Sequence, residues 1–177
     1  FTEVVNVDSG VDYRLRTLEQ AELYHHPLDS EANSSLEKSF QGLIADPRHV
    51  EANSSVEILG RKIPAKAVCD DIAWFDFYAL CDGPRSQNDY IELGKLFHAV
   101  IVSDVPAMGS KNDDLARRFI NLIDEFYDRG VKVIMSADAP IPDIYSTGKL
   151  EFEFQRTTSR MLEMQSHEYL AREHRPD

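Results

Sequence analysis

Residues 97–106, FHAVIVSDVP, place an acidic side chain at the end of an apolar run. Asp104 follows strand-forming residues, and Pro106 ends the run. A carboxylate at the carboxyl end of a parallel strand can hold a magnesium ion, because open α/β sheets bind ligands at that edge. The alternative is a structural aspartate that caps or turns the chain before Pro106. Residues 131–140, VKVIMSADAP, repeat the same rhythm.

A phosphate-binding loop is the partner that such an acidic strand requires. The pattern is G-x-x-x-x-G-K-[ST], because backbone amides cradle the phosphates and the lysine and hydroxyl complete the site. The two Gly-Lys pairs, Gly94-Lys95 and Gly148-Lys149, are followed by leucine, and neither has the required earlier glycine. We therefore expect that this chain alone neither binds nor hydrolyses ATP in that way.

Two arginines share one face of a predicted C-terminal helix. Arg156 and Arg160 are four residues apart, and such a like-charge pair costs a few tenths of a kcal/mol. One interpretation is a solvated charge network with Glu153 and Glu163. The other is a contact with an anion, either a carboxylate of a neighbouring domain or a phosphate. A second basic pair, Arg117 and Arg118, points in two directions about 100° apart on its helix.

Metal ligands and activated nucleophiles are not indicated. Cys69 and Cys81 have no nearby histidine or second cysteine at zinc-site spacing. Ser103 and Ser136 lack the G-x-S-x-G elbow of serine hydrolases. We expect no metal and no covalent catalysis in this chain.

Composition narrows the class of protein. The 177 residues are 42% hydrophobic, which suits one globular domain with a real core. A net charge of −12 argues against nucleic acid as the partner. Two cysteines suit a reducing cytosol, and no apolar run reaches the roughly 20 residues of a membrane span. The chain opens on strand-like residues rather than methionine, so we expect a segment of a longer protein.

The first half of the chain reads as short elements. The sequence predicts a strand over 3–8, weak helices over 17–25 and 33–45, and an exposed loop over 45–55. Three strand-like runs follow, VEILG, RKIPAKAVC and IAWFDFYALC, with a hairpin turn at 59–62. Asp76, inside the third run, is expected to face solvent at a sheet edge.

The second half is more regular. Ser86 can cap a helix over 87–97. A strand over 99–104, a helix over 112–129 and a strand over 131–136 make a βαβ unit, with Gly130 ending the helix. A long final helix covers 152–173. The predicted class is α/β, or α+β, with a mixed sheet.

Four stretches together resemble one family: NVDSGVDYRLRTL, RSQNDYIELGKLFHAVIVSDVP, ARRFINLIDEFYDRGVKVIMSADAP and FEFQRTTSRMLEMQSHEYLAREH. They are similar to the C-terminal half of the AFG-one-like ATPases, above all of their ZapE-like cell-division branch. The resemblance runs almost end to end, and only 27–57 is loose. The family's motif positions fall on the following residues of this chain: Asp12, Tyr13, Arg14, Asp104, Pro106, Arg117, Arg118, Asp124, Arg156, Arg160 and Glu163.

The resemblance implies a P-loop, AAA-like ATPase that uses ATP and magnesium to remodel protein assemblies in cell division, with polymers of FtsZ as the target. It implies that residues 1–10 lead out of an upstream ATPase core, the partner in cis, and that 11–177 form the C-terminal domain. Arg156 or Arg160 would sense nucleotide or contact that core, by analogy with other ATPases. Glu163, Arg117 and Arg118 are further candidates for the same role. A stand-alone acidic interaction module is the alternative from another class.

Overall fold

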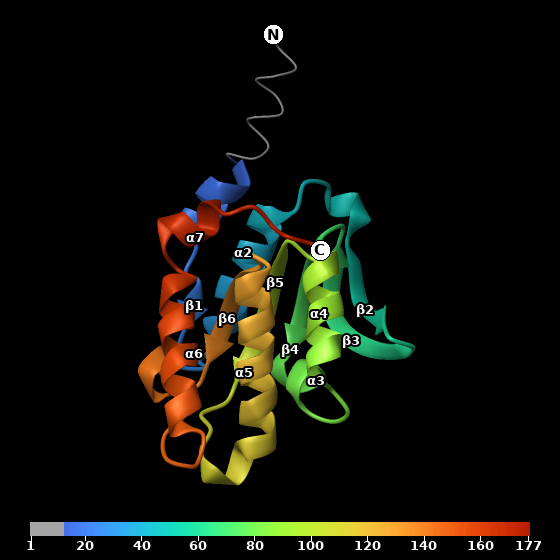
Figure 1. The fold of residues 1–177 in the computed structure, drawn as a ribbon. Helices are drawn as coiled ribbons and strands as arrows, with labels where there is room; N and C mark the ends of the chain where they lie inside the picture. The colour runs from blue at the N-terminus through green and yellow to red at the C-terminus, as the bar shows by residue number, and fades with distance from the viewer. Residues whose placement is uncertain (1–12) are drawn as a thin grey trace.

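The computed structural model describes residues 13–177, and the strand expected over 3–8 and Asp12 lie outside that range. Six strands form one mixed sheet in the order β1-β6-β5-β4-β3-β2 (Figure 1). Strands β1, β6, β5 and β4 run parallel, whereas β3 and β2 are antiparallel to their neighbours. The predicted class, α/β with a mixed sheet, is confirmed. The strands are β1 (Tyr24–His25), β2 (Glu51–Ile58), β3 (Arg61–Cys69), β4 (Ile72–Asp76), β5 (Ala99–Val105) and β6 (Lys132–Ala137).

Helices cover both faces of this sheet. Figure 1 shows α4, α5 and α6 in front of the strands and α2 behind them. Along β4 the side chains alternate between two cores, because Phe75 packs with the front helices and Trp74 with α2. The helices are residues 13–20, α2 (Ala32–Leu43), α3 (Phe77–Cys81), α4 (Gln87–Leu96), α5 (Asp113–Asp128), α6 (Glu151–Glu163) and α7 (His167–Ala171), with 3-10 turns at Pro47–His49, Ser110–Asn112 and Ile141–Asp143.

The predicted βαβ unit is confirmed. Strands β5 and β6 are adjacent and parallel. Helix α5 connects them in the chain and packs on the front face of the sheet. The apolar stripe of α5 is buried at Phe119, Leu122, Ile123 and Phe126, while Leu115 at its start stays half-buried. The helix 87–97 and its cap are also confirmed, because Ser86 and Asp89 form a reciprocal capping box.

Two predicted elements in the first half are wrong. The expected loop over 45–55 contains most of β2, whose backbone pairs with β3 along its length although its side chains are largely exposed. The weak helix over 17–25 ends early, and Tyr24–His25 instead pair with β6. In both cases ladder hydrogen bonds to another strand override a local pattern: β2 pairs with the next strand along the chain, and β1 with a strand more than 100 residues away.

Two further predictions place an element's end wrongly. The run IAWFDFYALC is a strand only to Asp76, whose carboxylate accepts a hydrogen bond from the Tyr78 amide at 3.0 Å and starts α3. The long helix over 152–173 is two helices, because the Ser166 hydroxyl accepts from the Tyr169 amide and caps α7. The hairpin turn is confirmed, with positive φ at Leu59 and Gly60.

Among residues 13–177, no helix combines the length and the apolar character needed to cross a bilayer.

Candidate functional site

Two aspartates meet at the carboxyl ends of adjacent parallel strands. Asp76 ends β4, and Asp104 lies one residue before the end of β5. Asp104 has a left-handed backbone with a φ of 64°, inside a register shift between Val102 and Val105. Its amide donates to the Ser136 hydroxyl at 2.9 Å. The bulge therefore turns the Asp104 side chain toward β4, at the edge where α/β sheets bind ligands.

Lys66 of β3 completes this group. Its ammonium lies 4.0 Å from a carboxylate oxygen of Asp104 and 5.6 Å from the centre of the Trp74 ring. Burial raises the pKa of Asp76, and the nearby Asp104 carboxyl raises it further. The group can share a proton between two carboxyls, or offer negative charge to a cation. We call Lys66, Asp76 and Asp104 the carboxyl-edge group.

The carboxyl-edge group has only two carboxylates, which are too few ligands to hold a metal ion by themselves. Within residues 13–177, the structure brings together no cluster of three or more histidine, cysteine, aspartate or glutamate side chains suited to a metal ion. An ion at the carboxyl-edge group would need ligands from outside this part of the chain.

Three of the predicted site residues form one ion-pair cluster. Asp124 of α5 lies between Arg160, at 2.5 Å, and Arg156, at 3.2 Å, both on α6. The Arg160 guanidinium also lies 4.8 Å from the centre of the Tyr127 ring. Glu163 accepts the Tyr127 hydroxyl at 2.5 Å rather than pairing with Arg160. The carboxylate that relieves the two arginines is therefore on a different helix from the one that the sequence interpretation used.

The remaining motif positions are spread over the fold. The Tyr13 hydroxyl donates to the Ile44 carbonyl at 3.0 Å, and Arg14 makes two hydrogen bonds to Asp71. Arg118 donates to the Cys81 carbonyl at 3.2 Å, whereas its neighbour Arg117 is exposed. These contacts are structural in kind, because each fastens one element to another.

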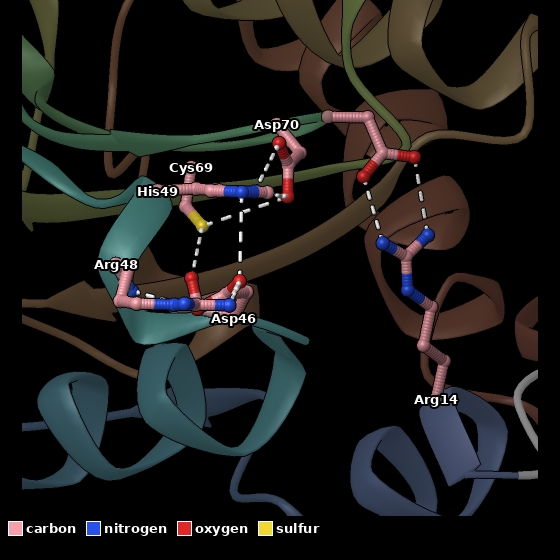
Figure 2. Close-up of polar contacts among 7 residues, drawn as sticks. Arg14, Asp46, Arg48, His49, Cys69 and Asp70 are labelled. Carbon is pink, nitrogen blue, oxygen red and sulfur yellow. Dashed lines mark hydrogen bonds and ion pairs between the residues drawn. The ribbon is translucent and has the colours of Figure 1, made fainter.

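A polar cluster joins the 3-10 turn before β2 to the turn between β3 and β4. Figure 2 shows His49 between Asp46 and Asp70, with Cys69 beside them. The ring nitrogens of His49 lie 3.1 Å from Asp70 and 3.5 Å from Asp46, and Asp70 raises the His49 pKa. Burial raises the pKa of the Cys69 thiol, so the thiol stays protonated and is a poor nucleophile.

A buried lysine that the sequence interpretation missed lies at the amino-terminal ends of the parallel strands. Lys132 has no exposed surface, and its ammonium donates to the carbonyls of Gly130 at 2.5 Å and Arg172 at 2.6 Å. Burial lowers its pKa to about 8. The residues after α7 cross this edge as a strap, because the Arg175 amide also donates to the Arg129 carbonyl at 2.7 Å.

Asp76 could have been found from its sequence, but Lys66 could not. Asp76 follows the strand residues IAWF as Asp104 follows VIVS. The sequence interpretation instead continued the strand past Asp76. Lys66 is one of several charged residues on a half-exposed strand, and only the tertiary fold sets it beside Asp104.

Known proteins resemble this chain over nearly all of its length. The family model of the AFG1-like ATPases matches residues 1–173. The cell division protein ZapE of Escherichia coli strain K12 is 47% identical over 172 residues, which are 97% of this chain and 45% of that protein. Lactation elevated protein 1 homolog B of Danio rerio is 30% identical over 96% of this chain and 40% of its own length. The chain thus spans less than half the length of these relatives. No solved structure matches it.

Proposed function

Because this chain belongs to the AFG1-like ATPase family, we propose that it is one part of a protein that hydrolyses ATP and acts in cell division. The observation that carries the proposal is the 47% identity to a cell division protein over 97% of the chain. The matched length contains both the carboxyl-edge group and the Asp124 cluster, since both lie well inside residues 1–173 of the family match.

In this proposal, the phosphates of ATP bind to a part of the full-length protein outside these 177 residues. The 177 residues contain no G-x-x-x-x-G-K-[ST], the pattern whose amides and lysine bind them. More than half of each relative lies outside the matched segment, and we assign the nucleotide and its magnesium ion to that part. The segment described here then couples hydrolysis to a target.

Arg156 is the residue we assign to contact with the ATP-hydrolysing part or its nucleotide. Arg160 is 25% exposed and fixed by Asp124 and Tyr127, whereas the Arg156 side chain is 63% exposed. Arg117 and the carboxyl-edge group are further candidates, because Arg117 is exposed and Asp104 is only partly paired. The target we propose is the FtsZ polymer, on the family resemblance of the sequence.

The test uses the full-length protein and this chain side by side. The full-length protein should hydrolyse ATP, and with ATP it should reduce the amount of FtsZ that sediments as polymer. Calorimetry of this chain with ATP and magnesium should show no micromolar binding.

Each part of the proposal has its own contrary result. A full-length protein without ATPase activity would overturn the enzymatic proposal and favour a simple interaction module. Saturable micromolar binding by this chain alone would move the nucleotide site into the segment. Unchanged sedimentation of FtsZ would remove that target while leaving the ATPase.

A further inference from the structure

Helix α6 carries an unusual set of exposed side chains. Phe152 is 79% exposed, more than any other large apolar residue in the described part of the chain, and Leu162 on the same helix is 51% exposed. The Arg156 side chain between them is 63% exposed. The α6 outer face is the set Phe152, Gln155, Arg156, Ser159, Leu162 and Glu163, all of them exposed.

These residues share one side of the helix by their spacing. Phe152, Arg156, Ser159 and Glu163 follow the i, i+4, i+7, i+11 rule of a single helical stripe. The opposite side buries Phe154, Thr157 and Met161. Single exposed apolar residues need no explanation, but an aromatic ring and an arginine on one stripe, with a leucine beside it, form a larger surface. Aromatic residues and arginine are enriched at the centres of protein–protein contacts.

The α6 outer face is also held rigidly. On the inner side, the Phe154 ring stacks against Phe119 with centroids 6.1 Å apart and against Tyr145 with centroids 5.0 Å apart. The Arg160–Asp124 ion pair fixes the last turn of the helix to α5. A face mounted in this way loses little conformational freedom when a partner binds it.

Arg156 retains capacity for a second carboxylate. It donates one hydrogen bond, of 3.2 Å, to an oxygen of Asp124, whose other oxygen already accepts Arg160 at 2.5 Å. A guanidinium has five N–H donors, and carboxylates bind it best through two parallel hydrogen bonds. A facing carboxylate would therefore find donors available on Arg156, one helical turn from the Phe152 ring.

We infer that the α6 outer face docks the ATP-hydrolysing part of the same full-length protein, through a surface that offers an apolar depression to Phe152 and a carboxylate to Arg156. The inference rests on the proposed function. The ATP-hydrolysing part is favoured over a separate protein as the occupant because of chain length. More than half of each relative lies beyond the matched segment, and that part is covalently joined to this one and available to pack against it. It is favoured over a second copy by charge, because this chain's own formal charge of −12 makes like copies repel.

A single reporter cysteine tests the docking without relying on activity. Ser159 lies at the middle of the α6 outer face, and Ser159→Cys changes its size little. The two native cysteines are each 1% exposed, so they react slowly. We expect a maleimide probe to label position 159 rapidly in this chain and at least about tenfold more slowly in the full-length protein, with mass spectrometry identifying the labelled peptide.

Two added substitutions and one control make the result specific. In the full-length Ser159→Cys background, Phe152→Ala and Arg156→Ala should each restore most of the fast labelling. The control is Ser34→Cys on α2, on the opposite face of the sheet and exposed. Its labelling rate should be the same in the chain and in the full-length protein.

Three results would overturn the inference. The first is equal labelling of position 159 in both proteins. The second is protection in this chain alone that grows with concentration, which would make a second copy the occupant. The third is equal protection at positions 34 and 159, which would show general burial instead of docking by α6. The labelling does not depend on ATP turnover, so an inactive full-length protein with a protected α6 outer face would contradict the proposed function and keep the docking.

Discussion

At the scale of single residues, Arg156 and Arg160 have different environments around Asp124, although the sequence gives no reason to distinguish them. Arg160 loses more water on folding and gains an ion pair and a tyrosine ring, whereas Arg156 stays mostly in solvent. Exposed ion pairs contribute little because solvent screens them, and partly buried ones with a second contact contribute more.

We therefore predict different costs for the two alanine variants of this chain. Arg160→Ala should lower the free energy of unfolding by about 1–2 kcal/mol, and Arg156→Ala by less than about 0.5 kcal/mol. Urea denaturation of both variants and of the unmodified chain measures the difference. Equal costs would mean that Asp124 does not distinguish the two.

The His98 imidazole gives the second prediction at this scale. Burial, together with the positive charges of Arg14 and Lys132, lowers its pKa to about 4 against the opposing charge of Asp71. His174 also faces it. Between pH 6.5 and 4 the unfolded chain binds the proton that the folded chain refuses, so His98 makes stability fall as pH falls.

Removing this imidazole should flatten the acid side of the stability curve. Between pH 7 and pH 5, His98→Gln should lose about 2 kcal/mol less of its unfolding free energy than the unmodified chain loses. Histidines 25, 49 and 167 have raised pKa values and act in the opposite direction, but both proteins contain them. Parallel pH curves for the two proteins would show that His98 is not buried as described.

At the scale of elements, the turn between α5 and β6 decides where the C-terminal strap lies. Gly130 has a φ of +68°, and a Cβ there would lie 2.6 Å from the Glu173 carbonyl oxygen of the strap. The same turn supplies the carbonyl that binds the Lys132 ammonium. Helix end, buried lysine and strap therefore depend on one residue without a side chain.

Gly130→Ala should destabilise the chain by about 2–4 kcal/mol, since it combines backbone strain with a contact against backbone. Gly60→Ala is the matched control, because Gly60 has a φ of +80° and a Cβ added there would meet no atom within 4 Å. It should cost about 1 kcal/mol. Thermal or urea unfolding measures both, and a Gly130 variant no worse than the Gly60 variant would show that the strap gives way freely.

At the scale of the whole molecule, net charge sets the response to salt. The chain carries 31 acidic and 19 basic residues, a formal charge of −12. Like charges in a compact state repel, and salt screens that repulsion over about 10 Å at 0.1 M.

We predict that raising sodium chloride from about 20 to 300 mM stabilises the chain by about 1 kcal/mol, which raises Tm by about 2–4 °C for a protein of this size. Screening weakens the surface ion pairs at the same time, but each of those contributes little. Thermal melts at several salt concentrations test the balance. A Tm that falls steadily with salt would show that the ion pairs outweigh the net charge.

Regular amphipathic segments were predictable because their information is local. The helix 112–129, Gly130 and the two flanking strands follow from apolar spacing and one stop signal, and the structure confirms them. The cap at Ser86 is equally local. The Asp124 cluster was half predictable: the sequence placed the two arginines together, but their counter-ion is 32 residues away from Arg156.

The pentapeptide EANSS shows most directly what the sequence alone did not decide. At residues 31–35 it starts helix α2, and at 51–55 it lies in strand β2. The five residues are identical, so the difference comes from their surroundings: Leu36 and Phe40 bury one side of α2 against the sheet, whereas β2 pairs with the backbone of β3. By itself the sequence determined the class, the βαβ unit and the family resemblance. Pairing with β3 decided that residues 51–55 are a strand, and the tertiary structure decided the carboxyl-edge group and the counter-ion of the arginines, because these two depend on atoms brought together from distant parts of the chain.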